Sequence, residues 1–270
     1  MTSVAPRATV GARIGFPPWA QNVTGVALLL GLFEAVPQTG LVPAAYLPPL
    51  HRVAAALADE VARPLFWFSL YETLRGWAIG LVIAATAAIV VGVLIGTTPF
   101  LRTATHSTIE FLRPIPSVAL IPLAVLLFGT DLRSKLLLIV YASFWQVLIQ
   151  VLYGVQDLDP VARDTARSYR FSRWGLVRHV IWPTALPYVM TGLRLASAVA
   201  LVLAVTSELI IGAPGLGQQI ALAQSGGATA TLYAYVVVTG LVGITINTLA
   251  RWTERRALAW HPSVRGEVAS

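Results

Sequence analysis

Six long apolar stretches constrain the fold of this 270-residue chain more than any other feature of its sequence. A helix that crosses a bilayer needs about 20 predominantly apolar residues. The stretches that approach or exceed this length span residues 19–36, 74–96, 111–128, 136–152, 186–211 and 232–250. We therefore expect an all-α, polytopic membrane protein with about six transmembrane helices.

The composition leaves little room for a separate soluble domain. Only 11% of the residues are charged, whereas soluble domains carry about 25%. Cysteine is absent and no two of the four histidines have metal-ligand spacing, so the sequence predicts neither thiol chemistry nor a metal site. The net charge of +7 comes almost entirely from arginines in the predicted loops. We expect these arginines to set membrane orientation and not to bind nucleic acid.

Arginine is concentrated on one side of the predicted membrane topology. Six spans place both termini on the same side, and Arg102 and the arginines of residues 155–183 share that side. Because basic residues accumulate in cytoplasmic loops, we expect both termini to be cytoplasmic. The predicted domains are then a cytoplasmic tail over residues 1–18, a transmembrane domain over residues 19–250 and a second cytoplasmic tail over residues 251–270.

A polar, arginine-rich segment interrupts the apolar pattern at residues 155–183. Asp159 and Pro160 form a typical helix start, an acidic cap followed by proline in the first turn. Ser172 is placed to cap a second helix, and Pro183 is expected to end the segment or to begin the next span. The pattern predicts two short helices separated by a turn.

The small residues Thr165 and Ala166 give the first of these helices a shallow face. A partner's groove can approach such a face closely, and the surrounding arginines can pair with acidic or backbone groups on that partner. The segment is therefore predicted to dock an aqueous partner; the alternative is a solvated basic loop beside anionic lipid. No phosphate-binding Gly-x-x-x-x-Gly-Lys-Ser/Thr motif occurs, so ATP hydrolysis is not expected from this chain.

The spacing of this segment resembles the cytoplasmic loop of binding-protein-dependent ABC importer permeases. The family pattern is Glu-Ala-Ala, three residues, Gly, nine residues, Ile, one residue, Leu-Pro. The matching positions hold Asp164, Thr165, Ala166, Arg170, Val180, Trp182 and Pro183. Arg170 thus stands at the glycine position. Either the turn differs from the family's or the bend moves to Phe171 and Ser172, because positive φ is unusual for arginine.

Further segments, in the same order along the chain, resemble the nitrate/sulfonate/taurine-type permeases of that family. Each is weak alone, but together and with matching hydropathy they form a specific resemblance. They are residues 46–49, 113–123, 186–194, 207–209 and 215–217.

The resemblance implies a type I ABC importer permease fold in the bacterial inner membrane, with no enzymatic activity and no cofactor of its own. It implies a second permease copy, most simply a homodimer, two ATP-binding cassette subunits that bind the ATP, an extracytoplasmic substrate-binding protein and surrounding membrane lipid. The implied substrate is a small anion such as nitrate, a sulfonate or taurine, or a related small molecule. The implied ATPase-docking residues are Ala162, Arg163, Asp164, Thr165, Ala166, Arg167, Tyr169, Arg170, Phe171, Ser172 and Pro183.

Four residues are candidates for the solute pathway. Glu208 is an ionisable residue in an apolar span, so it is either a pathway residue or a polar anchor near the outer membrane face. Pro116 and Pro122 break a span and leave carbonyls that either line a cavity or accompany a packing kink. Gln218 lies in the glycine-rich residues 212–229, which form either a re-entrant segment or an outer loop.

A proton-coupled secondary transporter is the alternative function. Such a protein needs several intramembrane carboxylates or histidines as a relay. This chain offers essentially Glu208, with Glu34 near the end of the first span. A membrane enzyme is not expected, because no clustered catalytic set is apparent.

Overall fold

The computed structural model describes residues 18–40 and 42–260. The described residues form two compact units, which divide between Ala55 and Ala56. Among the described residues every regular element is a helix, which confirms the all-α prediction. Four of the described helices are long and apolar enough to cross a membrane, and a bent helix pair makes a fifth span if it is counted as one.

The first unit contains α1 (Pro18–Gln38) and the first turns of α2 (Leu50–Val61). The side chain of Glu34 connects the two. Its Oε1 lies 2.8 Å from His51 Nδ1, and its Oε2 accepts a hydrogen bond from the His51 backbone N at 3.3 Å. A carboxylate near a helix N-terminus compensates the unpaired N–H groups there. Glu34 is therefore engaged in holding the start of α2.

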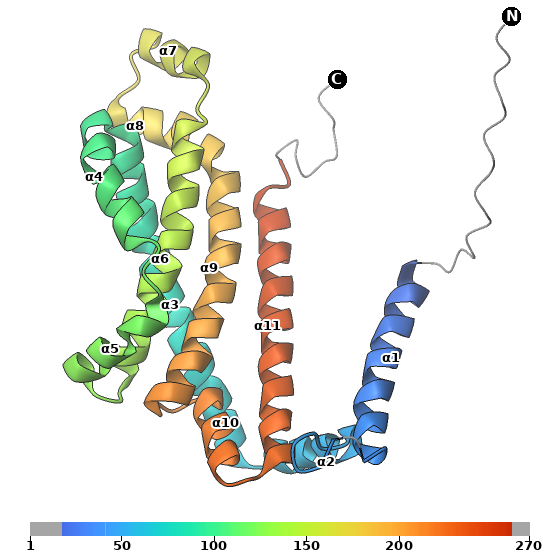
Figure 1. Ribbon diagram of the computed structural model, residues 1–270. Helices are drawn as coiled ribbons and strands as arrows, with labels where there is room; N and C mark the ends of the chain where they lie inside the picture. Colours follow the sequence, from blue (N-terminus) through green and yellow to red (C-terminus); the bar gives the residue numbers. More distant parts are fainter. Residues whose placement is uncertain (1–17, 41, 261–270) are drawn as a thin grey trace, which may run out of the picture. The chain divides into compact units, whose positions relative to one another are not determined.

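The second unit is built around four long helices that run side by side (Figure 1). They are α3 (Pro64–Thr97), α6 (Leu132–Gln156), α9 (Trp182–Ile211) and α11 (Thr229–Ala257). The most extensive packing is that of α6 against α9 on one side and against α3 on the other. The short helices α7 (Pro160–Ser168) and α8 (Arg173–Leu176) lie at one end of this bundle, and α10 (Leu216–Ser225) lies at the other (Figure 1).

A stripe of small residues on α3 brings it close to α6. Every fourth position, on one face of the helix, holds glycine or alanine: Gly76, Gly80, Ala84, Ala88, Gly92 and Gly96. A Cβ atom on Gly80 would lie 2.5 Å from Ile139 Cγ2, and one on Gly96 would lie 2.8 Å from Val155 Cγ1. Small residues in this register let two membrane helices approach closely.

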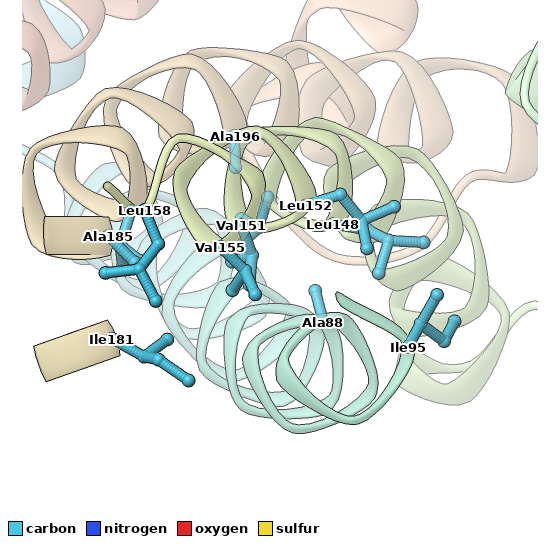
Figure 2. Packing of buried hydrophobic residues seen from close by; sticks show 12 residues of the cluster. Ala88, Ile95, Leu148, Val151, Leu152, Val155, Leu158, Ile181, Ala185 and Ala196 are labelled. Atoms are coloured by element: carbon cyan, nitrogen blue, oxygen red, sulfur yellow. The ribbon is translucent and has the colours of Figure 1, made fainter. Parts of the chain in front are cut away.

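A buried apolar cluster joins α3, α6 and α9 at the end of the bundle that carries α7 and α8 (Figure 2). Two of its members flank the polar segment of the sequence. Leu158, which precedes α7, is 7% exposed, and Ile181, which precedes α9, is 3% exposed. Both ends of residues 158–181 are therefore fixed to the same core.

The third predicted span, residues 111–128, is not one straight helix. It is replaced by α4 (Pro99–Leu112), the short helix η1 (Ser117–Leu120) and α5 (Ile121–Phe128), with a bend of 83° between the two halves. Pro114 and Pro116 occupy the break, where neither can donate a backbone hydrogen bond. Arg102, expected in a loop, lies within α4 as a consequence.

Candidate functional site

The polar segment begins as the sequence predicts, with two capped helix starts separated by a turn, but only the first helix, α7, is short and separate. Asp159 Oδ1 accepts a hydrogen bond from the Val161 backbone N at 2.8 Å, and Pro160 is the first residue of α7. Ser172, the residue before α8, accepts a hydrogen bond at its Oγ from the Gly175 backbone N at 3.1 Å. Each cap satisfies a donor that a helix N-terminus leaves free.

The turn between α7 and α8 is made by Arg170 itself. Its φ is 56°, and it is the one non-glycine residue with positive φ in the described part of the chain. The Phe171 backbone N donates to the Ala166 carbonyl at 3.0 Å, which closes the end of α7 as in a Schellman motif. The bend has not moved to Phe171 and Ser172. Arg170 therefore adopts a left-handed conformation, which has no steric cost for glycine but does have one for arginine.

Arg170 gives a paired test of this turn. An L-residue in the left-handed region costs about 1–2 kcal/mol, so Arg170→Gly is expected to tighten the turn and Arg170→Ile to loosen it. Hydrogen exchange of the Phe171 amide measures the effect. Because 1.4 kcal/mol changes an equilibrium constant tenfold, we expect the Phe171 amide to exchange at least about fivefold more slowly in Arg170→Gly than in the parent protein. In Arg170→Ile it should exchange faster than in the parent protein. Identical exchange in both variants would show that the backbone here is unstrained.

The predicted docking residues divide between the surface and the interior. Ala166 is only 5% exposed, so it faces the chain itself and does not share an open face with the exposed Thr165. The other exposed residues of the set are Asp164, Tyr169, Arg170, Phe171 and Ser172, whereas Ala162, Arg163 and Pro183 are half-buried. The backbone of Arg167 lies in α7, and its side chain is outside the described part of the structure.

Pro183 begins no new, separate helix. It is the second residue of α9, but α8, the π-helix η2 (Val177–Ile181) and α9 continue one another, and residues 174–211 form one candidate span. The Trp182 backbone N donates to the Val177 carbonyl, five residues earlier. This wider turn directly precedes the proline, which lacks a donor of its own.

A buried ion pair lies at the other end of the bundle. Lys135 Nζ on α6 is 2.7 Å from Glu208 Oε1 on α9, and the two side chains are 1% and 0% exposed. The remaining donors of Lys135 reach the carbonyls of Glu72 at 3.0 Å and Pro214 at 3.2 Å. A buried charge is tolerated only with such complete pairing.

The second carboxylate oxygen of Glu208 connects α3 and α10. Its Oε2 accepts hydrogen bonds from the Thr73 hydroxyl at 2.8 Å and from the Gly217 backbone N at 3.0 Å. The Leu216 backbone N donates in turn to Thr73 Oγ1 at 2.8 Å. A Cβ atom on Gly215 or Gly217 would overlap the Glu208 side chain, so these glycines let α10 approach the ion pair.

Lys135 is the residue that sequence reasoning missed. Because it directly precedes the apolar residues 136–152, the sequence predicts that it ends an outer loop. In the structure it lies inside α6, whose first residue is Leu132. The available signal was Glu208, a lone carboxylate in an apolar span, since a buried carboxylate requires a partner. Lys135 is the only lysine in the sequence.

Among the described residues, no side chain of the remaining pathway candidates is hydrogen-bonded to Lys135 or Glu208. Pro116 precedes η1, and Pro122 is the second residue of α5. Gln218 Nε2 donates to the Gly212 carbonyl at 2.7 Å, which ties the start of α10 to the end of α9. The glycine-rich segment thus contains the helix α10, whose start is held to the end of α9 by the Gln218 side chain.

A cavity of about 990 Å³ lies between α4 and α6. Both basic and acidic side chains contribute to its lining, together with hydroxyl and amide groups. The polar lining residues are Arg102, Thr103, His106, Ser107, Glu110, Arg113, Tyr153 and Gln156. Most of these lie on α4, where the sequence predicted a loop and not a helix.

Residues 73–258 match the family described as the binding-protein-dependent transport system inner membrane component. The chain belongs to this family. It is 26% identical over 248 residues to a putative aliphatic sulfonates transport permease of Bacillus subtilis (strain 168), covering 92% of this chain and 90% of the relative. It is 32% identical over 250 residues to the taurine transport system permease of Escherichia coli (strain K12), covering 90% of each.

The fold is also similar to that of one chain in a solved ABC transporter. A chain of the inward-facing MetNI methionine ABC transporter superimposes with a TM-score of 0.63 at 18% identity, covering 72% of this chain and 98% of the other. This binding-protein-dependent inner membrane component is thus the permease subunit of an ABC importer. Its role is transport, and the ATPase of such an importer is a separate subunit.

Proposed function

We propose that this permease imports a small sulfonate-type anion and couples to a cytoplasmic ATPase through residues 155–183. Two of the chain's relatives are a putative aliphatic sulfonates permease and a taurine permease, and taurine is itself a sulfonate. The observation that carries the coupling role is the turn at Arg170, where an arginine with a left-handed φ stands at the position that the family pattern assigns to glycine. Nitrate, which the name of another relative specifies, is the second candidate anion.

The packing of the segment supports a role as a lever. Leu158 and Ile181 enter the core that joins α3, α6 and α9 (Figure 2), and the Tyr188 hydroxyl on α9 donates to Asp157 Oδ2 at 2.7 Å. A displacement of α7 is therefore transmitted to the spans and is not absorbed by a slack loop. Coupling requires such a rigid element between two states.

The proposed assembly contains two copies of this chain, two ATP-binding cassette subunits and an extracytoplasmic binding protein, and the cassettes bind the ATP. We place both termini and residues 155–183 in the cytoplasm on the basis of the arginine distribution. The proposed domains are tails over residues 1–18 and 251–270 and a permease domain over residues 19–250. Residues 1–17 and 261–270 lie outside the described part of the chain.

For Glu208 we propose the role of polar anchor and not that of pathway residue. Its side chain is 0% exposed, and each of its carboxylate oxygens is hydrogen-bonded. A side chain that contacts solute has to reach a water-filled space. The α4–α6 cavity, bordered by Arg102 and Arg113, is a better candidate for part of the anion's route.

Uptake into proteoliposomes tests the function. The permease is reconstituted with the ATPase that co-purifies with it, and the binding protein is added outside with labelled taurine or an alkanesulfonate. We expect accumulation only when ATP is enclosed with the ATPase, and none with a non-hydrolysable analogue. Accumulation driven by a proton gradient without the ATPase would instead favour the secondary-transporter alternative.

A further inference from the structure

A small polar pocket lies between α9 and α11, outside the regions considered so far. Its volume is about 430 Å³. One stripe of each helix lines it: Pro187, Thr191 and Arg194 from α9, and Arg251, Glu254, Arg255 and Leu258, the last at the end of α11. The spacing of three and four residues places each set on one helix face.

The charges in this pocket do not cancel. Arg194 Nη1 is 3.2 Å from Glu254 Oε2, and this pair leaves two positive charges, Arg251 and Arg255. Neither of these two arginines has a carboxylate within ion-pair distance in the described part of the chain. The Arg194–Glu254 pair joins the walls of the pocket, and the two uncompensated guanidinium groups lie one helical turn apart beside it. Guanidinium groups bind phosphate oxygens in a bidentate manner.

The neighbouring surface has the character of a membrane interface. Trp252 is 52% exposed, and the guanidinium carbon of Arg256 lies 4.6 Å from its ring centroid. Tryptophan is enriched where a membrane protein crosses the headgroup layer. The pocket is lined by the first turns of α9 and the last turns of α11. These helix ends lie at the end of the bundle that carries α7 and α8 (Figure 1), and basic pockets between membrane helices on the cytoplasmic side bind phosphate-bearing headgroups.

We propose that Arg251 and Arg255, with Arg194 held by Glu254, form a binding site for a phosphate group, occupied by the headgroup of an anionic phospholipid. The lipid would bridge α9 and α11 at their common end. The apolar border formed by Leu258 and Pro187 suits a ligand with an apolar body better than a free ion. This site is independent of the transported solute and of ATPase docking.

Native mass spectrometry of the full-length chain tests the site. Phosphatidylglycerol and phosphatidylcholine with identical acyl chains are titrated separately onto the detergent-solubilised protein. In Arg251→Gln/Arg255→Gln the affinity for phosphatidylglycerol should fall about thirtyfold, because each basic residue near an anionic lipid surface contributes about 1 kcal/mol and 1.4 kcal/mol is a factor of ten. Phosphatidylcholine binding should not change.

Two control variants keep this test decisive. Arg256→Gln removes one positive charge from the same helix, at a residue that does not line the pocket, and it should bind phosphatidylglycerol like the parent protein. Arg251→Lys/Arg255→Lys keeps the charge but not the bidentate donors and should bind phosphatidylglycerol more tightly than the glutamine variant, which separates loss of the site from misfolding. Equal affinities in the glutamine variant and in Arg256→Gln, or equal binding of the two lipids by the parent protein, would overturn the proposal.

A separate arm distinguishes the source of the phosphate. Inorganic phosphate is added at millimolar concentration before the lipid. If it leaves phosphatidylglycerol binding unchanged, the occupant is the lipid, as proposed. If it displaces the lipid from the parent protein but has no effect on Arg251→Gln/Arg255→Gln, the phosphate chemistry of the site holds and a free anion is the occupant.

Discussion

Glu208→Gln is expected to lower the thermal unfolding midpoint of the purified permease by on the order of 10 °C. The substitution leaves the Lys135 ammonium buried without a counter-charge, and breaking a buried ion pair from one side costs about 3–5 kcal/mol. Lys135→Met should have an effect of similar size, because it strands the carboxylate instead. Thermal unfolding in detergent, followed by loss of monodisperse protein, measures both.

The double variant Lys135→Met/Glu208→Gln decides between anchor and pathway residue. Removing both charges together is far less costly than removing one, and the glutamine oxygen can still accept from the Gly217 backbone N. We expect the midpoint to recover most of its loss and uptake to recover with it. Glu110→Gln makes the same chemical change on a 69% exposed side chain and should leave the midpoint unchanged. A stable Glu208→Gln protein without uptake, unrescued by the double variant, would make Glu208 a pathway residue.

Thr165→Trp is expected to reduce ATPase co-purification at least tenfold while leaving the permease folded. Thr165 is exposed on α7, next to the buried Ala166, so a large side chain there meets the partner and not the core. A bulky group in the middle of a close-packed interface costs 2 kcal/mol or more, and 1.4 kcal/mol is a factor of ten. Quantitative pull-down of the ATPase by tagged permease measures the loss.

Thr253→Trp provides the matched control for this interface. Thr253 is an exposed threonine on α11, outside residues 155–183. ATPase co-purification should be unaffected by it. Ala166→Glu is a poorer test, because Ala166 is 5% exposed in the permease alone and a charge there would disturb α7 whether or not a partner binds. Equal assembly of both tryptophan variants would remove α7 from the docking surface.

The local chemistry of the polar segment could be predicted from sequence because it depends on neighbours in the chain. Asp159 and Ser172 cap their helices through hydrogen bonds to residues two and three positions away. The register of the family pattern likewise located the bend at Arg170 or just after it. The sequence could not choose between these alternatives, because the φ angle at Arg170 depends on how both flanking helices are fixed to the core.

Contacts between distant segments were beyond the reach of sequence pattern alone. Lys135 and Glu208 are 73 residues apart, and nothing in the local hydropathy around Lys135 distinguishes a buried lysine from one in a loop. The division of residues 111–128 into η1 and α5, with α4 before them, was similarly hidden, because apolar content does not reveal where a proline pair turns the chain by 83°. The sequence likewise predicts an exposed position for Ala166, because its burial comes from packing between elements and leaves no signal in the local sequence.

The fourfold spacing of small residues on α3 restricts how the permease can change shape. Ile139 and Val155 of α6 each project into a notch that a single methyl group would fill. Advancing one helix along the other by a single residue, 1.5 Å, would drive these side chains out of their notches and against the bulkier flanking residues. We therefore expect α3 and α6 to move together as one rigid body during transport. The hinge of the cycle has to be sought elsewhere, and the sharp corner between α4 and α5 is a natural place for it.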